Sequence, residues 1–76
     1  MSLSPRQIEI LVLSARGYTE RQIAYLTKSS HHTINIHKRT IFYRLGAVSM
    51  ANAISIAYCR QIITPQLVSE REPLPK

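Results

Sequence analysis

The chain has 76 residues and a mass of 8.7 kDa, enough for one small domain, and its single cysteine excludes an internal disulfide bond. Ten Lys and Arg residues against four Asp and Glu residues give a formal net charge of +6, which is typical of a domain that contacts a polyanion. The apolar runs are short and the N-terminus lacks signal-peptide character, so we expect neither a membrane span nor secretion. The composition therefore indicates a folded, basic domain of the cytoplasm without membrane contact.

Two helices are predicted in the first third of the chain. The pair Ser4 and Pro5 is typical of a helix start, and Gly17 supplies the left-handed residue that ends many helices. Thr19 followed by Gln22 is a capping-box pattern, which predicts that a second, short helix begins there. Because apolar residues recur at helical spacing in both segments, each helix is expected to bury one side.

The third predicted helix begins at Ser30, after a short turn over residues 27–29, and runs to Leu45. Gly46 is suited to end this helix in the left-handed conformation. A very short connection between two helices is typical of a helix-turn-helix. The second and third helices therefore form a candidate unit of that kind.

A fourth helix is predicted over about residues 50–63, capped by Ser49 and ended near Pro65. Residues 64–76 contain further prolines and little apolar periodicity, so we expect a flexible C-terminal tail there. The β-branched residues of the chain fall at helical rather than alternating spacing. The expected fold is all-α, with a four-helix domain over residues 1–63 followed by the tail.

The third helix has two different faces when its residues are placed 100° apart. One face is apolar and is expected in the core through Ile34, Ile41 and Leu45. The opposite face has no acidic residue and carries His32, Asn35, Ile36, Arg39 and Tyr43. In the major groove of DNA, arginine reads guanine, asparagine reads adenine and an aliphatic side chain meets the thymine methyl group. This face is a candidate for reading base edges, although such a face is also often only a solvated surface.

Groups suited to phosphate surround this face. Arg21 and Gln22 stand at the start of the second helix, where backbone N–H groups lack partners within the helix. Thr33, Lys38 and Arg44 flank the face on the third helix. Contacts to phosphate set the register of a protein on DNA but carry no sequence information.

Catalysis and metal binding have little support in the sequence. No serine or cysteine is accompanied by a histidine with an orienting partner, and no glycine-rich phosphate loop is present. His31 and His32 diverge by about 100° on a helix, and no Cys-x-x-Cys pair accompanies them. We therefore expect no enzyme activity, no cofactor and no metal site.

A longer pattern of residues resembles a known family. Its parts are the segments 3–6, 9–11 and 15–17, together with Ile23, Ala24, Ser30, Thr33, Ile34, His37, Ile41, Leu45 and Gly46. From about Leu3 to Ile63, without a gap, the chain resembles the LuxR/NarL-type (LuxR C-terminal-like) helix-turn-helix DNA-binding domain of bacterial transcriptional regulators. The resemblance implies a four-helix domain whose third helix is the recognition helix and whose fourth helix often forms the dimer contact on inverted repeats.

The resemblance also assigns roles to residues by position. It places Asn35, Ile36 and Arg39 at base-contacting sites, to which the outward face of the helix adds His32. It places near the DNA backbone Thr33, His37 and Lys38, as well as Arg21 and its neighbour Gln22. The resemblance and the helical spacing therefore point to the same surface.

The turn between the second and third helices departs from the family pattern. Thr27 and Ser29 stand where apolar residues are usual, and Lys28 stands where glycine is common. Two polar residues in place of buried aliphatic ones would cost about 1–3 kcal/mol each if the sites stayed dry. Either Tyr25 and Leu26 fill the space, or the turn is looser than usual.

A second departure lies on the first helix. Ile8 and Val12 stand one turn apart where the family often has charged residues. They either pack locally or form a docking surface for a partner protein or a further regulatory domain.

The fourth helix is the candidate for a homodimer contact. Small and apolar residues form a stripe expected to be the dimer face, namely Ala53, Ile56, Ala57 and Arg60. The alternative is that this helix packs onto the core of its own domain, through Ile54, Ala57 and Tyr58.

The expected function is sequence-specific binding of double-stranded DNA through recognition helix 30–45, in a bacterial transcriptional regulator associated with the nucleoid. The alternative is a protein-interaction module of the same fold, which modulates another regulator through Ile8 and Val12 or the fourth helix, without reading DNA sequence. Family members usually carry a sensory or phosphoacceptor domain as well. The sequence leaves open whether this chain is free-standing or part of a longer regulator.

Overall fold

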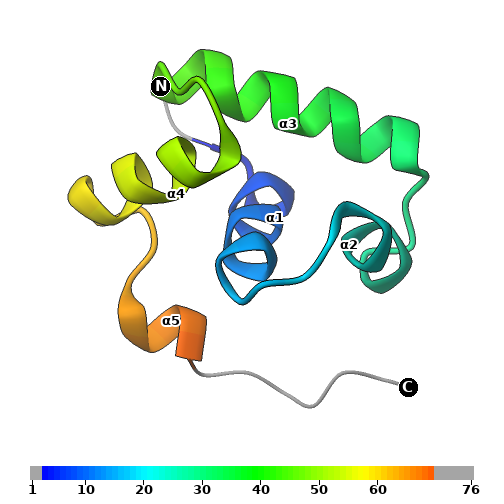
Figure 1. Cartoon of the computed structure of the whole chain (residues 1–76), viewed down its shortest axis with the longest axis horizontal. Helices are drawn as coiled ribbons and strands as arrows, with labels where there is room; N and C mark the ends of the chain where they lie inside the picture. The colour runs from blue at the N-terminus through cyan, green and yellow to red at the C-terminus, as the bar shows by residue number, and fades with distance from the viewer. Residues whose placement is uncertain (1–2, 70–76) are drawn as a thin grey trace.

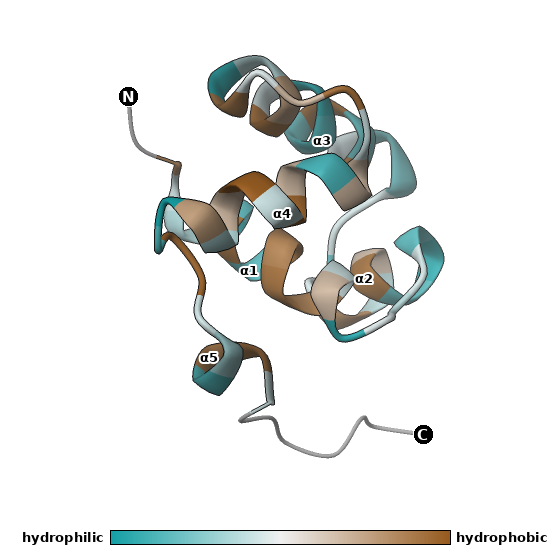
Figure 2. Ribbon diagram, turned by 60° about the vertical axis from the view of Figure 1, so that its left-hand side comes forward, coloured by the Kyte–Doolittle hydropathy of each residue, from teal (hydrophilic) through white to brown (hydrophobic). Residues whose placement is uncertain are grey.

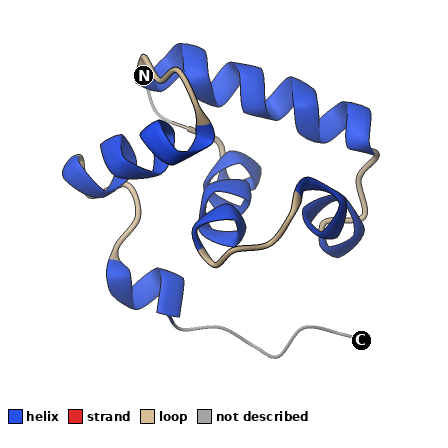
Figure 3. Ribbon diagram, in the orientation of Figure 1, coloured by secondary structure: helices blue, strands red, loops and turns tan. Residues whose placement is uncertain are grey.

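The structure is a computed structural model that describes residues 3–69 and consists of helices joined by short loops (Figure 1; Figure 3). The helices are α1 (Pro5–Ala15), α2 (Glu20–Leu26), α3 (His31–Leu45), α4 (Met50–Cys59) and α5 (Pro65–Ser69). The described residues form no strand, which confirms the all-α prediction. Among them, no helix has the length and apolar character that crossing a membrane requires.

The four predicted N-caps are confirmed. Each has an extended backbone, and its side chain accepts a hydrogen bond from the backbone N–H three residues later, at Ser4, Thr19, Ser30 and Ser49. The predicted capping box of Thr19 with Gln22 is present, and Gln7 forms a second box with Ser4. Local side-chain chemistry therefore sets where these helices begin.

The same four helices also end in the same way, each followed by a residue in the left-handed backbone conformation. Among residues 3–69, those with positive φ are Gly17, Lys28, Gly46 and Gln61, at 98°, 55°, 69° and 59°. In each case the N–H of the next residue donates to the carbonyl oxygen five positions earlier, at 2.8–3.2 Å. This is the Schellman arrangement, which satisfies carbonyl groups that the helix leaves without partners.

The predicted end of the fourth helix is wrong by four residues. α4 ends at Cys59, because Gln61 adopts the left-handed conformation and the N–H of Ile62 donates to Ala57 O at 2.8 Å. No glycine marks this turn, so the sequence pattern did not reveal it. The turn directs Ile63 back into the core, where it is 1% exposed.

The predicted tail over residues 64–76 is also corrected in its first part. α5 lies within it, packs against α1 and is held there by Arg16. The Arg16 Nε donates to Val68 O at 2.7 Å, and a terminal guanidinium nitrogen donates to Leu67 O at 3.0 Å. Residues 70–76 lie outside the described part of the chain. α5 sits on the side of the molecule away from α3 (Figure 1; Figure 2).

The hydrophobic core lies between α1 and the helices that pack around it. Its fully buried large side chains are Ile10, Leu11, Ile23, Ile34, Ile41 and Ile63. α3 lies along one edge of the molecule, and α1, α2 and α4 pack against its inner side (Figure 1). This arrangement leaves the outer side of α3 without a packing partner among the described residues.

The turn after α2 accommodates its polar residues with hydrogen bonds. Thr27 is 5% exposed, and its hydroxyl donates to Ile23 O at 2.7 Å. The hydroxyl of Ser29 donates to Thr27 O at 3.3 Å. Tyr25 does not fill the turn, since it is 68% exposed. The burial of Thr27 therefore leaves no unsatisfied hydroxyl.

The proposed docking surface on the first helix is wrong for Val12. Val12 is 7% exposed and belongs to the core, while Ile8 is half-buried and packs against it. Ile8, Val12 and Arg16 follow one another at four-residue spacing and so lie along one side of α1, and Arg16 at its end contacts α5. Local packing explains the two apolar residues.

The expected dimer stripe on the fourth helix is wrong for its two alanines. Ala53 and Ala57 are completely buried in the core of their own domain, and Ile54 and Tyr58 pack against that core as the alternative predicted. Of the stripe, Ile56 is half-buried and Arg60 is exposed. The apolar spacing of α4 therefore reflects intramolecular packing.

Candidate nucleic-acid interface

The outer face of α3 contains the residues that the helical spacing placed there. His32, Asn35 and Arg39 are exposed, Ile36 is 50% exposed and Tyr43 is 83% exposed. On the opposite side of the helix, Ile34, Ile41 and Leu45 are at most 3% exposed. The predicted division of α3 into a core side and an outer side is therefore confirmed.

A hollow lies on this outer face. It is lined by His32, Asn35, Ile36 and Arg39, the four residues predicted to contact bases. The lining combines a guanidinium, an amide, an imidazole and a branched aliphatic side chain. These groups donate and accept hydrogen bonds in the patterns that base edges present, and the aliphatic group suits a methyl contact.

The start of α2 carries two of the predicted phosphate contacts, an exposed cation and an amide that already has a hydrogen-bond partner. Arg21 and Gln22 are both exposed. The Gln22 side-chain oxygen accepts from the Thr19 N–H at 2.9 Å, and the Gln22 N–H donates to the Thr19 hydroxyl at 3.2 Å. Arg21 is thus the more available of the two for a phosphate, because Gln22 serves the capping box.

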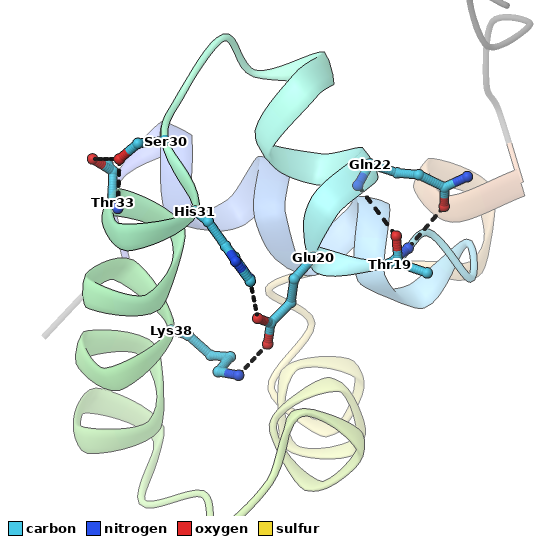
Figure 4. A network of polar contacts seen from close by, with 7 residues as sticks. All are labelled: Thr19, Glu20, Gln22, Ser30, His31, Thr33 and Lys38. Atoms are coloured by element: carbon cyan, nitrogen blue, oxygen red, sulfur yellow. Dashed lines mark hydrogen bonds and ion pairs between the residues drawn. The ribbon is translucent and has the colours of Figure 1, made fainter.

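Two further predicted phosphate contacts are half-buried on the flank of α3. These are Thr33 and His37. The Thr33 hydroxyl accepts from the Ser30 hydroxyl at 3.0 Å, and the Thr33 N–H donates to the same Ser30 oxygen at 3.0 Å. Thr33 therefore belongs to the cap of α3 as well as to its flank (Figure 4).

Lys38 and Arg44 have intramolecular partners. The Lys38 ammonium forms an ion pair with Glu20, and a guanidinium nitrogen of Arg44 donates to the Gln7 side-chain oxygen at 3.2 Å. The same Gln7 oxygen accepts from the Ser4 N–H at 3.0 Å. Arg44 therefore joins the last turn of α3 to the first turn of α1, a role that the sequence pattern did not reveal.

Glu20 joins α2 to α3, and sequence reasoning missed it. One carboxylate oxygen contacts Lys38 and the other contacts His31 Nε2 at 2.9 Å (Figure 4). The hydrogen bond from Lys38, followed by that from His31, lowers the pKa of Glu20, while partial burial opposes this shift. The sequence did offer a signal for this contact, because Glu20 is an acid in the first turn of α2 and the next helix is basic and has no acid of its own.

The comparisons with known proteins agree with this architecture. Residues 1–57 match the family described as bacterial regulatory proteins, luxR family. No solved structure matches the chain. Since the match extends over most of the chain, it bears on the whole of α1 to α3 and most of α4.

Three curated relatives support the same assignment. A probable transcriptional regulatory protein, SgaR of Hyphomicrobium methylovorum, is 34% identical over 72% of this chain and 26% of its own length. The fimbriae Z protein of Salmonella typhimurium is 33% identical over 83% of the chain and 30% of its own. The transcriptional activator protein BglJ of Escherichia coli is 39% identical over 74% of this chain and 25% of its own length. The chain thus spans between 25% and 30% of the length of these relatives, and it belongs to the luxR family of bacterial regulatory proteins.

Proposed function

We propose that this domain binds double-stranded DNA sequence-specifically and thereby regulates transcription in a bacterium. The observation that carries the proposal is the hollow on the outer face of α3, where all four side chains are exposed and none is acidic. The names of two relatives, a probable transcriptional regulatory protein and a transcriptional activator, support the same function. The excess of basic residues supplies the attraction to DNA.

In this proposal α3 is the recognition helix. It has 15 residues and is therefore about 22 Å long, so that its first turns enter a major groove about 12 Å wide while its last turn reaches the groove edge. Arg39 reads guanine, Asn35 reads adenine, Ile36 meets a thymine methyl group and His32 contacts a base at the entering end. Since Tyr43 lies one turn after Arg39, it falls near the groove edge.

Phosphate contacts surround the recognition helix. Arg21, at the start of α2, is the principal candidate because it is an exposed cation. Gln22, Thr33 and His37 are secondary candidates because they are engaged in caps or half-buried. These contacts set register and contribute to affinity for every sequence.

We also propose that the domain acts as a homodimer on inverted repeats at the nucleoid. Its contact would involve Ile56 and Arg60, the two members of the expected stripe that are not fully buried. The alternative of a protein-interaction module is left with the fourth helix and the half-buried Ile8 as docking surfaces, because Val12 belongs to the core.

Selection of bound duplexes from a random pool tests the function. We expect an enriched motif with inverted symmetry, bound with an affinity that falls steeply as salt rises. Recovery of a single half-site would contradict the dimer while leaving sequence reading intact. Recovery of no preferred sequence, under salt conditions where the domain binds DNA, would contradict sequence-specific recognition.

A further inference from the structure

The carboxylate of Glu20 holds two cationic or potentially cationic groups of α3. Lys38 and His31 both point toward it, from the flank of α3 that faces α2 (Figure 4). The Lys38 side chain is 26% exposed in this arrangement. Glu9, the other described acid, pairs instead with Arg6 within α1, at 3.1 Å.

We propose that Glu20 is a positioning residue that keeps the Lys38 ammonium away from the DNA backbone and so limits sequence-independent attraction to DNA. This inference rests on the proposed function. It assigns to Lys38 the opposite of the phosphate-contacting role that the family resemblance implies.

The position of Lys38 on α3 supports this inference. Lys38 lies three residues after Asn35, so the two side chains are neighbours on the helix surface. A lysine released from Glu20 would therefore extend beside the face that enters the groove, where phosphates border it. Its ion pair with Glu20 directs the ammonium toward α2 instead.

The charge balance gives the functional consequence. Sequence-independent binding to DNA depends on cations that displace counterions from phosphates, and each one adds about 0.9 to the slope of log affinity against log salt. A lysine neutralised by a carboxylate contributes little to this process. Glu20 therefore lowers affinity for all sequences alike. The base contacts of α3 then determine which sequences the domain prefers.

The Glu20→Gln variant tests the effect on affinity. Glutamine keeps the size and a hydrogen-bonding oxygen but removes the charge that holds Lys38. We expect binding to a scrambled duplex at low salt to tighten about 3- to 10-fold, with a salt slope steeper by about one. Glu9→Gln is the matched control, since it changes net charge equally within a Glu–Arg pair on α1, and we expect less than a twofold change.

Lysine footprinting separates release of Lys38 from a simple loss of repulsion. Acetylation of each lysine is measured with and without DNA by mass spectrometry, and exposed Lys28 serves as a second lysine in the same sample. We expect DNA to leave Lys38 acetylation unchanged in the unaltered protein and to slow it at least threefold in Glu20→Gln. Melting curves confirm that both variants are folded.

Three results would overturn the inference. These are protection of Lys38 by DNA in the unaltered protein, absence of protection in Glu20→Gln, or weaker binding by Glu20→Gln accompanied by a lower melting temperature. The last result would mean that Glu20 only holds α2 against α3. If the unaltered protein bound neither the selected nor the scrambled duplex, the proposed function itself would fail, and this outcome is distinct from the other three.

Discussion

Arg39 is the residue whose substitution tests base reading most directly. It is exposed and lines the hollow on α3 with Asn35 and Ile36. We expect Arg39→Ala to reduce discrimination at one base pair by about 1–3 kcal/mol, because a bidentate contact to guanine is lost. Competition binding with duplexes substituted at each position measures this effect.

Arg21→Ala is the matched control for that experiment. Arg21 is also an exposed arginine, but it lies at the start of α2. We expect its loss to weaken binding to every sequence similarly and to reduce the salt slope by about one. An Arg39→Ala variant that behaved in this way would contradict the assignment of α3 as the reading element.

Lys28 occupies a backbone conformation that favours glycine. Its φ of 55° ends α2 in the left-handed region, which costs a residue with a side chain about 1–2 kcal/mol. We expect Lys28→Gly to stabilise the domain by about 0.5–1 kcal/mol, since glycine removes this cost but loses more entropy on folding. Urea unfolding measures the change.

Gly17 provides the reverse substitution at an equivalent helix end. Its φ is 98°, and an added Cβ would meet no atom within 4 Å. We expect Gly17→Ala to destabilise the domain by about 1 kcal/mol through backbone strain alone. Equal stability of Lys28→Gly and the unaltered protein would contradict the predicted net gain from relieving the strain at Lys28.

At the scale of single elements, one side chain of α1 reaches the backbone of α5. Arg16 donates hydrogen bonds to the carbonyl oxygens of Leu67 and Val68. We expect Arg16→Met, which keeps an apolar stem but removes the donors, to detach α5 and to speed amide exchange at Val68 at least tenfold. Exchange in the centre of α3 should remain within twofold of its original rate, since α5 lies away from that helix.

The helix ends differ in how well sequence predicts them. Ser4, Thr19, Ser30 and Ser49 begin their helices as expected, because a cap is a contact between residues three apart in the chain. The end of α4 at Cys59 was not expected, since it requires a glutamine in the left-handed region. α5 was not expected either, because its carbonyl oxygens are bound by a residue more than 50 positions away.

At the scale of the whole molecule, the contact of α2 with α3 makes stability depend on pH. The hydrogen bonds from Lys38 and His31 hold the pKa of Glu20 below its ordinary value near 4.5. The pairing therefore stabilises the fold fully above that ordinary value, and this contribution is lost as pH falls through the lower folded-state pKa. We expect Glu20→Gln to reduce the loss of stability on the acid side, in urea unfolding measured from pH 7 to pH 3.

A matched substitution checks that the acid dependence belongs to Glu20. Glu9 also forms an ion pair, with Arg6, but this pair is exposed on a single helix. Such pairs contribute little to the free energy of unfolding. Glu9→Gln should leave the acid side of the stability profile unchanged. A similar profile for both variants would contradict the role given to the α2–α3 contact.

Much of the candidate interface follows from periodicity alone. Three buried aliphatic residues define the inner side of α3, and Asn35, Ile36 and Arg39 then necessarily face outward. The partners of Lys38 and Arg44 do not follow, because their contacts lie on α2 and α1. Helical spacing places a side chain on a face, but it does not say which other helix that face meets.

The sequence by itself determined the helix starts, the all-α class and the outer face of α3, because each depends on residues within a turn or two of one another. Only the tertiary structure decided that Val12 and Ala53 are core residues, that α5 packs on α1 and that Glu20 holds Lys38. These features depend on how separate helices meet, and contacts between residues far apart in the chain leave no periodic signal in it.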